Sequence, residues 1–244
     1  MTVSGHHAGA EKLSVGASDR ESKRLYLAGG VAALALGFGY LATIPIYAYV
    51  GSGPTAGDAW LRYLTGKATG WWMILGLSVA TDLLYVPAAL ALYEALKTAG
   101  RNLMLVATAF VGLFIVLDLA VTWSSYASLL TLAGSYRSAT SDLQRAALAA
   151  AANYPASVLA SPLERLYAIS LLSFAILLIG VVMLRGVFSK AASYLAIGIG
   201  VLGLASMAGW SVTILANALA ATLWVLLVGY RLVRLGSKPR DADG

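Results

Sequence analysis

The longest stretch without a charged side chain limits what this chain can fold into. Residues 191–230 are 40 consecutive positions with no Asp, Glu, Lys or Arg. A helix needs about 20 apolar residues to cross the hydrocarbon core of a bilayer, so this stretch is long enough for two crossings. We therefore expect a helical hairpin here, turning near Gly209, Trp210 and Ser211, in a chain that resides in a membrane.

The composition agrees with a membrane location. Of the 244 residues, 59% are hydrophobic and 11% are charged, whereas about 25% of the residues in soluble domains are charged. The absence of cysteine excludes a disulfide framework and thiolate chemistry. The formal net charge of +6 comes from cations near the ends of apolar stretches. We attribute this charge to membrane topology and expect no nucleic-acid partner.

The same length criterion predicts an all-α, polytopic transmembrane helix bundle with six spans. A polar tail over residues 1–24 precedes a six-helix domain over 25–235, and a second polar tail covers 236–244. Ser18 and Glu21 have the spacing of a capping box, which predicts that the first helix begins there. The predicted spans are residues 25–49, 71–96, 102–132, 163–185, 190–209 and 212–233.

The distribution of basic residues predicts the orientation of the bundle. With these spans, 12 of the 17 Lys and Arg residues fall on one side and 5 on the other. Since cytoplasmic loops carry the excess of Lys and Arg, we expect both termini in the cytoplasm. Trp71, Trp72 and Trp210 then fall at the outer boundary, as in an aromatic belt.

The outer link between the third and fourth spans carries two helix-start patterns. Ser141 with Gln144 forms a capping-box pattern before the alanine-rich residues 142–153. Ser161 is followed by Pro162 and, three positions on, by Glu164, which is a second such pattern with proline at the first helical position. We expect a short outer helix here, and the alternative is a simple connector.

Two carboxylates lie deep within predicted spans, away from the helix ends. Asp82 is in the second span and Asp118 in the third, where a charged side chain costs roughly 2.5–3.5 kcal/mol on the insertion scale. Helical spacing gives each aspartate polar neighbours on its own face: Ser78 and Tyr85 beside Asp82, Thr122 and Ser125 beside Asp118. Pro87 cannot donate to the carbonyl of Leu83, which frees an acceptor close to Asp82.

This pattern leaves two interpretations open. The pair is a proton or cation site made of Asp82, Tyr85, Asp118, Thr122 and Asn217, or each aspartate holds helices together through hydrogen bonds to Tyr, Trp, Ser or Asn217. For Asn217 itself, an interhelical hydrogen bond is the simpler role.

We expect no catalytic, metal or cofactor site. The only histidines, His6 and His7, are adjacent in the polar tail, and adjacent helical positions do not face one ligand. The glycine and tyrosine contexts of intramembrane aspartyl proteases do not surround Asp82 or Asp118.

Several segments resemble a bacterial six-helix integral membrane family called domain of unknown function four-three-eight-six. The residues that carry the likeness are Arg24-Leu25-Tyr26-Leu27-Ala28-Gly29, Asp82-Leu83-Leu84-Tyr85, Leu90-Ala91-Leu92-Tyr93, Leu178-Ile179-Gly180 and Leu184-Arg185-Gly186-Val187-Phe188. The resemblance implies a multi-pass protein of the bacterial inner (cytoplasmic) membrane. It implies no activity and no site residues.

Three functions follow as hypotheses. The first is an accessory or structural subunit of a membrane complex, because polar intramembrane residues are few. Its partners would be the lipid bilayer together with another membrane protein or a second copy of this chain. The second is a small transporter or proton- or cation-handling protein that uses Asp82 and Asp118. The third is an intramembrane enzyme, and between enzyme and non-enzyme we favour the latter.

Overall fold

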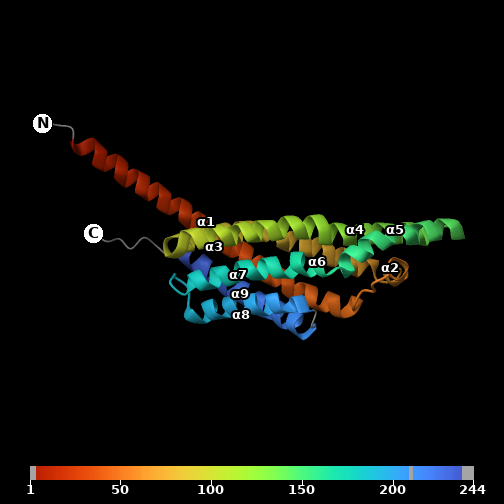
Figure 1. Cartoon of the computed structure of the whole chain (residues 1–244). Helices are drawn as coiled ribbons and strands as arrows, with labels where there is room; N and C mark the ends of the chain where they lie inside the picture. The colour runs from red at the N-terminus through yellow and green to blue at the C-terminus, as the bar shows by residue number, and fades with distance from the viewer. Residues whose placement is uncertain (1–3, 209–210, 238–244) are drawn as a thin grey trace.

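The computed structural model describes residues 4–208 and 211–237. In this part of the chain the secondary structure is helical, and there is no strand. Most of these helices run along one common direction in an elongated bundle (Figure 1). Two of the elements are π-helices, η1 and η2, and one is a 3₁₀-helix, η3. In chain order the elements are α1 Ser4–Val50, α2 Gly57–Leu64, α3 Ala68–Leu117, η1 Asp118–Trp123, α4 Ser124–Ser138, α5 Asp142–Ala160, α6 Pro162–Arg165, η2 Leu166–Ser170, α7 Leu171–Met183, α8 Lys190–Ala205, η3 Ser206–Ala208 and α9 Ser211–Gly236.

Five helical stretches in the described residues are long and apolar enough to cross a membrane. Between a third and a half of each most apolar window is buried inside the protein. The outward faces carry large apolar side chains such as Phe38, Leu83 and Val116, which are 62%, 54% and 62% exposed. Soluble monomers rarely expose apolar surface on this scale, so these are the helices of a multi-pass membrane protein. The five stretches are Arg20–Val50, Ala68–Ser138, Pro162–Met183, Lys190–Ala208 and Val212–Gly236.

The longest of these stretches reverses direction at Gly100. The backbone leaves helical geometry there, at φ −176° and ψ 71°. Trp123 donates a hydrogen bond to Asp82 across 41 positions of sequence. At a rise of 1.5 Å per residue, a straight helix would hold these residues about 60 Å apart. The two halves of α3 therefore run antiparallel, as the short predicted link at residues 97–101 indicates.

The remaining long helices pack around this hairpin. α1 contacts α3 and α9, α7 contacts α3 and α8, and α8 contacts α9. The start of α1 and the end of α9 lie at the same end of the bundle (Figure 1). Gly29 of α1 allows a close approach to α3, because a Cβ atom added there would lie 2.2 Å from Ala91 Cβ and 2.6 Å from the Pro87 carbonyl oxygen.

A second core forms at the opposite end of the bundle, where α2, α4 and α5 lie together (Figure 1). Sequence reasoning missed α2, which is only eight residues long and carries two charged side chains. It buries one apolar side through Trp60, Leu61 and Leu64. The core is made of Val50, Trp60, Leu61, Leu64, Trp71, Ile74, Leu129, Leu130, Ala133, Ala152 and Ala156.

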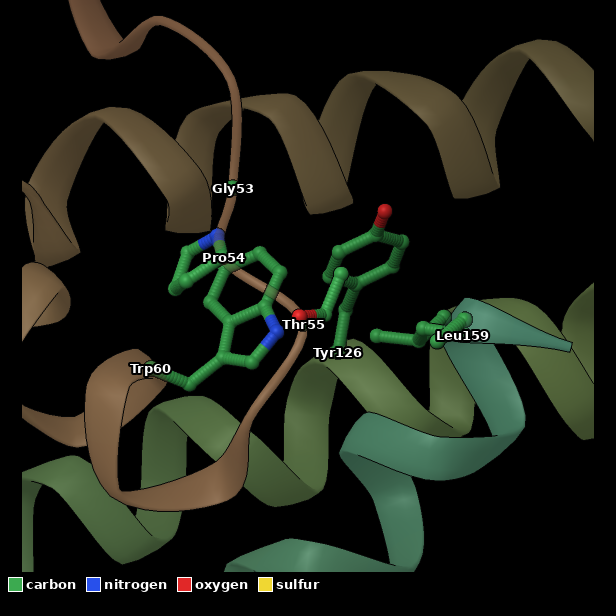
Figure 2. Close-up of a pocket in the computed structure, with 7 residues that line it drawn as sticks. Gly53, Pro54, Thr55, Trp60, Tyr126 and Leu159 are labelled. Atoms are coloured by element: carbon green, nitrogen blue, oxygen red, sulfur yellow. The ribbon is translucent and has the colours of Figure 1, made fainter.

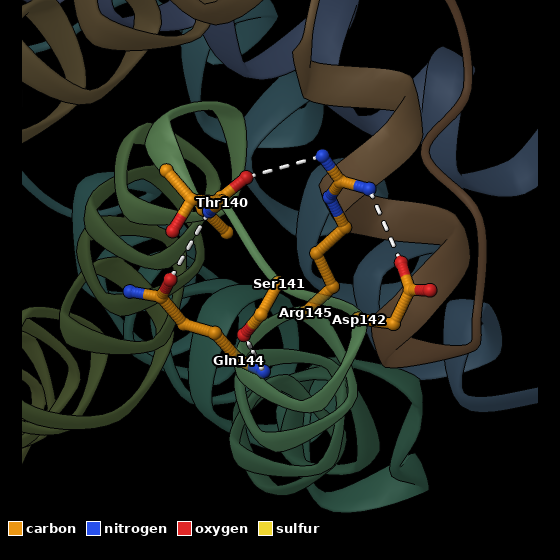
Figure 3. A network of polar contacts seen from close by, with 6 residues as sticks. Thr140, Ser141, Asp142, Gln144 and Arg145 are labelled. Carbon is orange, nitrogen blue, oxygen red and sulfur yellow. Dashed lines mark hydrogen bonds and ion pairs between the residues drawn. The ribbon is translucent and has the colours of Figure 1, made fainter.

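The predicted outer helix is present as α5 and is longer than expected. The Ser141 Oγ accepts a hydrogen bond from the Gln144 backbone N–H at 3.2 Å, and the Gln144 side chain accepts from the Thr140 N–H. Arg145 bonds the Ala139 carbonyl and the Asp142 carboxylate, which closes the network around the start of α5 (Figure 3). The Ser161 Oγ likewise accepts from the Leu163 N–H at the start of α6. A simple connector is therefore wrong for this link.

Two other predictions concerned the start of the first helix and the turn between the last two spans. The first helix does not begin at Ser18, because α1 runs without interruption from Ser4 and Ser18 lies in its interior. The capping-box pattern there is overridden by helical continuity on both sides. The predicted turn near Gly209, Trp210 and Ser211 lies mostly outside the described residues. α8 and η3 end at Ala208 and α9 begins at Ser211.

Candidate functional site

The two intramembrane carboxylates meet at one hydrogen-bond donor. The Trp123 Nε1–H donates to Asp82 Oδ2 at 3.0 Å and to Asp118 Oδ2 at 3.1 Å. Because both oxygens bond the same nitrogen, they lie within about 6 Å of each other. The side chains are deeply buried, with Asp82 3% and Asp118 4% exposed. We call Asp82 and Asp118 the aspartate pair.

The reversal at Gly100 and the π-helix η1 together build this pair. Asp82 stands on the first half of α3, while Asp118 and Trp123 come after the second half. In an α-helix a residue five positions on lies about 140° around the axis, facing away. In a π-helix the bonding repeat is five residues, so Trp123 returns to the side of Asp118. Trp123 was therefore missed, since the sequence carries no clear signal for a π-turn.

The pair lies where the two apolar cores meet. Phe114 belongs to the core of the long helices, whereas Trp123 packs against the second core. The π-helix η1 also contacts the second π-helix η2, which begins the α7 stretch. π-turns inside α-helices occur often at functional sites, and here one of them carries Asp118 and Trp123.

Thr122 also belongs to this site. Its side chain is 3% exposed, and its hydroxyl lies within hydrogen-bond distance of the Asp118 carboxylate, four residues before it. The Asp82 and Asp118 carboxylates lie within hydrogen-bond distance of each other as well. Buried polar atoms almost always have a partner, and these groups supply partners for one another.

The electrostatics of the pair are unfavourable when both carboxylates carry charge. Two like charges no more than about 6 Å apart repel by at least about 3 kcal/mol at an effective dielectric constant of 20. The Trp123 N–H offsets part of this repulsion through its two hydrogen bonds. A proton or a cation at the pair would relieve the rest.

Tyr85 lies one turn after Asp82 and forms a second polar contact. The Tyr40 hydroxyl of α1 donates to the Tyr85 hydroxyl at 3.0 Å. The Tyr85 ring also meets the Phe114 ring edge to face, with centroids 5.7 Å apart. Ser78, Asp82 and Tyr85 are all buried, as their predicted common face requires.

Asn217 does not hydrogen-bond to the aspartate pair. Its side-chain amide donates to the Ile199 carbonyl at 2.8 Å and reaches Ser173 Oγ at 3.5 Å. It thus joins α9 to α8 and α7, which matches the simpler role expected for it. Grouping Asn217 with Asp82 and Asp118 was wrong, because Asn217 lies at the interface of α9 with α8 and α7, whereas the aspartate pair lies between α3 and η1.

A pocket of about 180 Å³ opens in the second core near the pair. Trp60 and Tyr126 lie around Thr55, and Leu159 closes one side (Figure 2). A dry protein cavity of about 150 Å³ accommodates benzene, so this pocket admits a compact group of that size. Its lining is Gly53, Pro54, Thr55, Trp60, Tyr126, Leu159 and Ala160.

Aromatic contacts connect this pocket to the aspartate pair. The Tyr126 ring lies 5.9 Å from the Trp60 ring and 5.5 Å from the Trp123 ring, centroid to centroid. Trp123 in turn donates to both carboxylates. Tyr126 in the pocket wall therefore contacts Trp123, the residue that donates to both carboxylates.

No family model, curated protein or solved structure matches the chain. The resemblance to the bacterial six-helix family stays a prediction.

Proposed function

We propose that this chain is a multi-pass membrane protein that takes up and releases a proton or small cation at the aspartate pair. The observation that carries the proposal is the single Trp123 N–H shared by Asp82 Oδ2 and Asp118 Oδ2. Intramembrane carboxylates are costly, and two of them within about 6 Å cost more. Such an arrangement is explained most simply by a positively charged ligand that both carboxylates attract.

The proposed topology has six crossings with both termini in the cytoplasm. The reversal at Gly100 supports two crossings within Ala68–Ser138, which raises the five candidate stretches to six. The excess of Lys and Arg near the ends of α1 and α9 supports the orientation. The resemblance to the bacterial six-helix family supports a location in the bacterial inner membrane.

The second candidate is the accessory or structural subunit. The same N–H joins the first half of α3 to η1, and Asn217 joins α9 to α8, so both polar contacts also stabilise helix packing. An intramembrane enzyme ranks third, since it would need two carboxylates with access to water and substrate.

Flux measurements separate the first two candidates. We would reconstitute the full chain into liposomes and measure proton and Na⁺ flux, driven by a pH or Na⁺ gradient, for the wild type, Asp82→Asn and Asp118→Asn. Asp58→Asn is the matched control, because Asp58 lies in α2 with its side chain 47% exposed. We expect flux in the wild type and in Asp58→Asn, and its loss in the two other variants.

Equal flux in all four proteins, or flux no greater than in protein-free liposomes, would contradict the proposal. Purification in mild detergent then tests the accessory candidate. A membrane protein that co-purifies in stoichiometric amount with the wild type and with Asp82→Asn would support it.

A further inference from the structure

We propose that Arg185, Lys190 and Arg231 bind the phosphate group of an anionic phospholipid beside the link between α7 and α8. Residues 184–189 make up this segment, which we call the α7–α8 link. The inference goes beyond the proposed function, because it concerns other residues and does not depend on Asp82 or Asp118.

The α7–α8 link lies where lipid headgroups are found. It joins two of the stretches that are long and apolar enough to cross a membrane, Pro162–Met183 and Lys190–Ala208. Since only six residues separate these stretches, the link stays close to the bilayer surface. Val187 and Tyr194, which are 46% and 65% exposed, offer apolar and aromatic contacts to the lipid next to its headgroup.

Arg231 of α9 is held against this link. Its Nε and Nη2 both donate to the Val187 carbonyl oxygen, at 3.2 and 2.8 Å. These bonds fix the position of the guanidinium group, but the carbonyl is neutral and leaves the positive charge uncompensated. Because a guanidinium group has five N–H donors, three remain for a ligand, and arginine suits phosphate oxygens particularly well.

Two more cations surround the same link. The Lys190 ammonium group donates to the Leu184 carbonyl, which leaves two of its three N–H donors. Arg185 lies within the link, and its side chain is exposed. The ion pairs of the described residues are formed by Arg62, Lys97 and Arg145, so a carboxylate partner is found for none of the three cations in this part of the chain.

The neighbouring helix adds positive charge. A Cβ atom added to Gly186 would lie 2.4 Å from the Leu96 side chain, so the reversal of α3 packs against the link. Lys97 and Arg101 flank this reversal. Glu94, a carboxylate in this part of α3, is bound to Lys97 and Ser22. The surroundings therefore favour an anion, and basic pockets between membrane helices bind anionic lipid headgroups.

Native mass spectrometry of the purified full chain in a neutral detergent tests the inference. The probes are phosphatidylglycerol, which has a net negative charge, and phosphatidylcholine with the same acyl chains, which has none. Arg185→Gln is the main variant, because its exposed side chain makes no bond within the described residues that the fold requires. Arg137→Gln is the matched control, since Arg137 is an exposed arginine near the end of α4, at the opposite end of the bundle (Figure 1).

We expect the wild type to bind phosphatidylglycerol at least about tenfold more tightly than phosphatidylcholine, and Arg185→Gln to weaken phosphatidylglycerol binding about fivefold. Adding Lys190→Gln should weaken it further, whereas Arg137→Gln should leave it within about twofold of the wild type. Equal affinity of the wild type for the two lipids would overturn the inference, as would equal losses in Arg185→Gln and Arg137→Gln. Inorganic phosphate is the last probe. If it binds through Arg185 while phosphatidylglycerol is not preferred, the ligand is a soluble anion and the lipid site is wrong.

Discussion

Trp123→Phe is the substitution that tests the architecture of the pair most specifically. Phenylalanine keeps an aromatic ring but has no N–H, so Asp82 Oδ2 and Asp118 Oδ2 both lose their donor. Hydrogen bonds to charged groups contribute about 1.5–3 kcal/mol each. Because one N–H is shared between two acceptors, we expect the bond loss to lower the free energy of unfolding by about 2–3 kcal/mol.

Phenylalanine is also smaller than tryptophan, so the variant needs a control for lost volume. Trp224 supplies it, because its side chain is 2% exposed and its Nε1 has no hydrogen-bond partner among the described residues. Trp224→Phe removes the same atoms without breaking a bond. Trp123→Phe should therefore be about 2 kcal/mol more destabilising than Trp224→Phe.

The assay is reversible unfolding in mixed micelles, followed by circular dichroism. A double-mutant cycle with Asp82→Asn should show coupling of about 1–3 kcal/mol, the range for groups in direct contact. Equal destabilisation by Trp123→Phe and Trp224→Phe, within about 0.5 kcal/mol, would refute the shared hydrogen bond, as would a coupling near zero.

Two further substitutions test how the helices are joined and begin. Gly29→Ala should lower the free energy of unfolding by about 1–3 kcal/mol, since the new Cβ would meet Ala91 Cβ at 2.2 Å. Gly76→Ala is the control, because its new Cβ would meet open space and should not destabilise the protein. Equal effects of the two substitutions would contradict the close approach of α1 and α3. Ser141→Ala removes the cap of α5 and should cost about 1 kcal/mol, measured as faster hydrogen exchange at the start of the helix. Ser157→Ala is its control because Ser157 bonds only its own helix, and unchanged exchange in Ser141→Ala would disprove the cap.

Much of the fold could be predicted because it depends on local signals. Apolar length predicts the helices, and Lys97 and Arg101 flank the place where α3 reverses at Gly100. The capping pattern of Ser141 and Gln144 predicts α5, because it supplies partners for backbone N–H groups that a helix start leaves free. The same pattern at Ser18 was misleading, since α1 continues on both sides of it.

The candidate site could be predicted only in part. Asp82 and Asp118 are recognisable because carboxylates are rare within apolar spans. Their joint contact with Trp123 depends on a π-helix, and a single inserted residue in the bonding repeat has no sequence signature of its own. Asn217 illustrates the opposite error. An intramembrane amide suggests a polar cluster, but which helix interface it joins is decided by packing between helices far apart in sequence.

The most direct test of the central claim observes the Trp123 indole N–H itself. Its ¹⁵N–¹H resonance can be assigned by its loss in Trp123→Phe. If one N–H bonds both carboxylates, Asp82→Asn and Asp118→Asn will each shift this resonance, while Thr222→Val, on a different helix, will leave it in place. A resonance that keeps its wild-type position in either aspartate variant would contradict the aspartate pair.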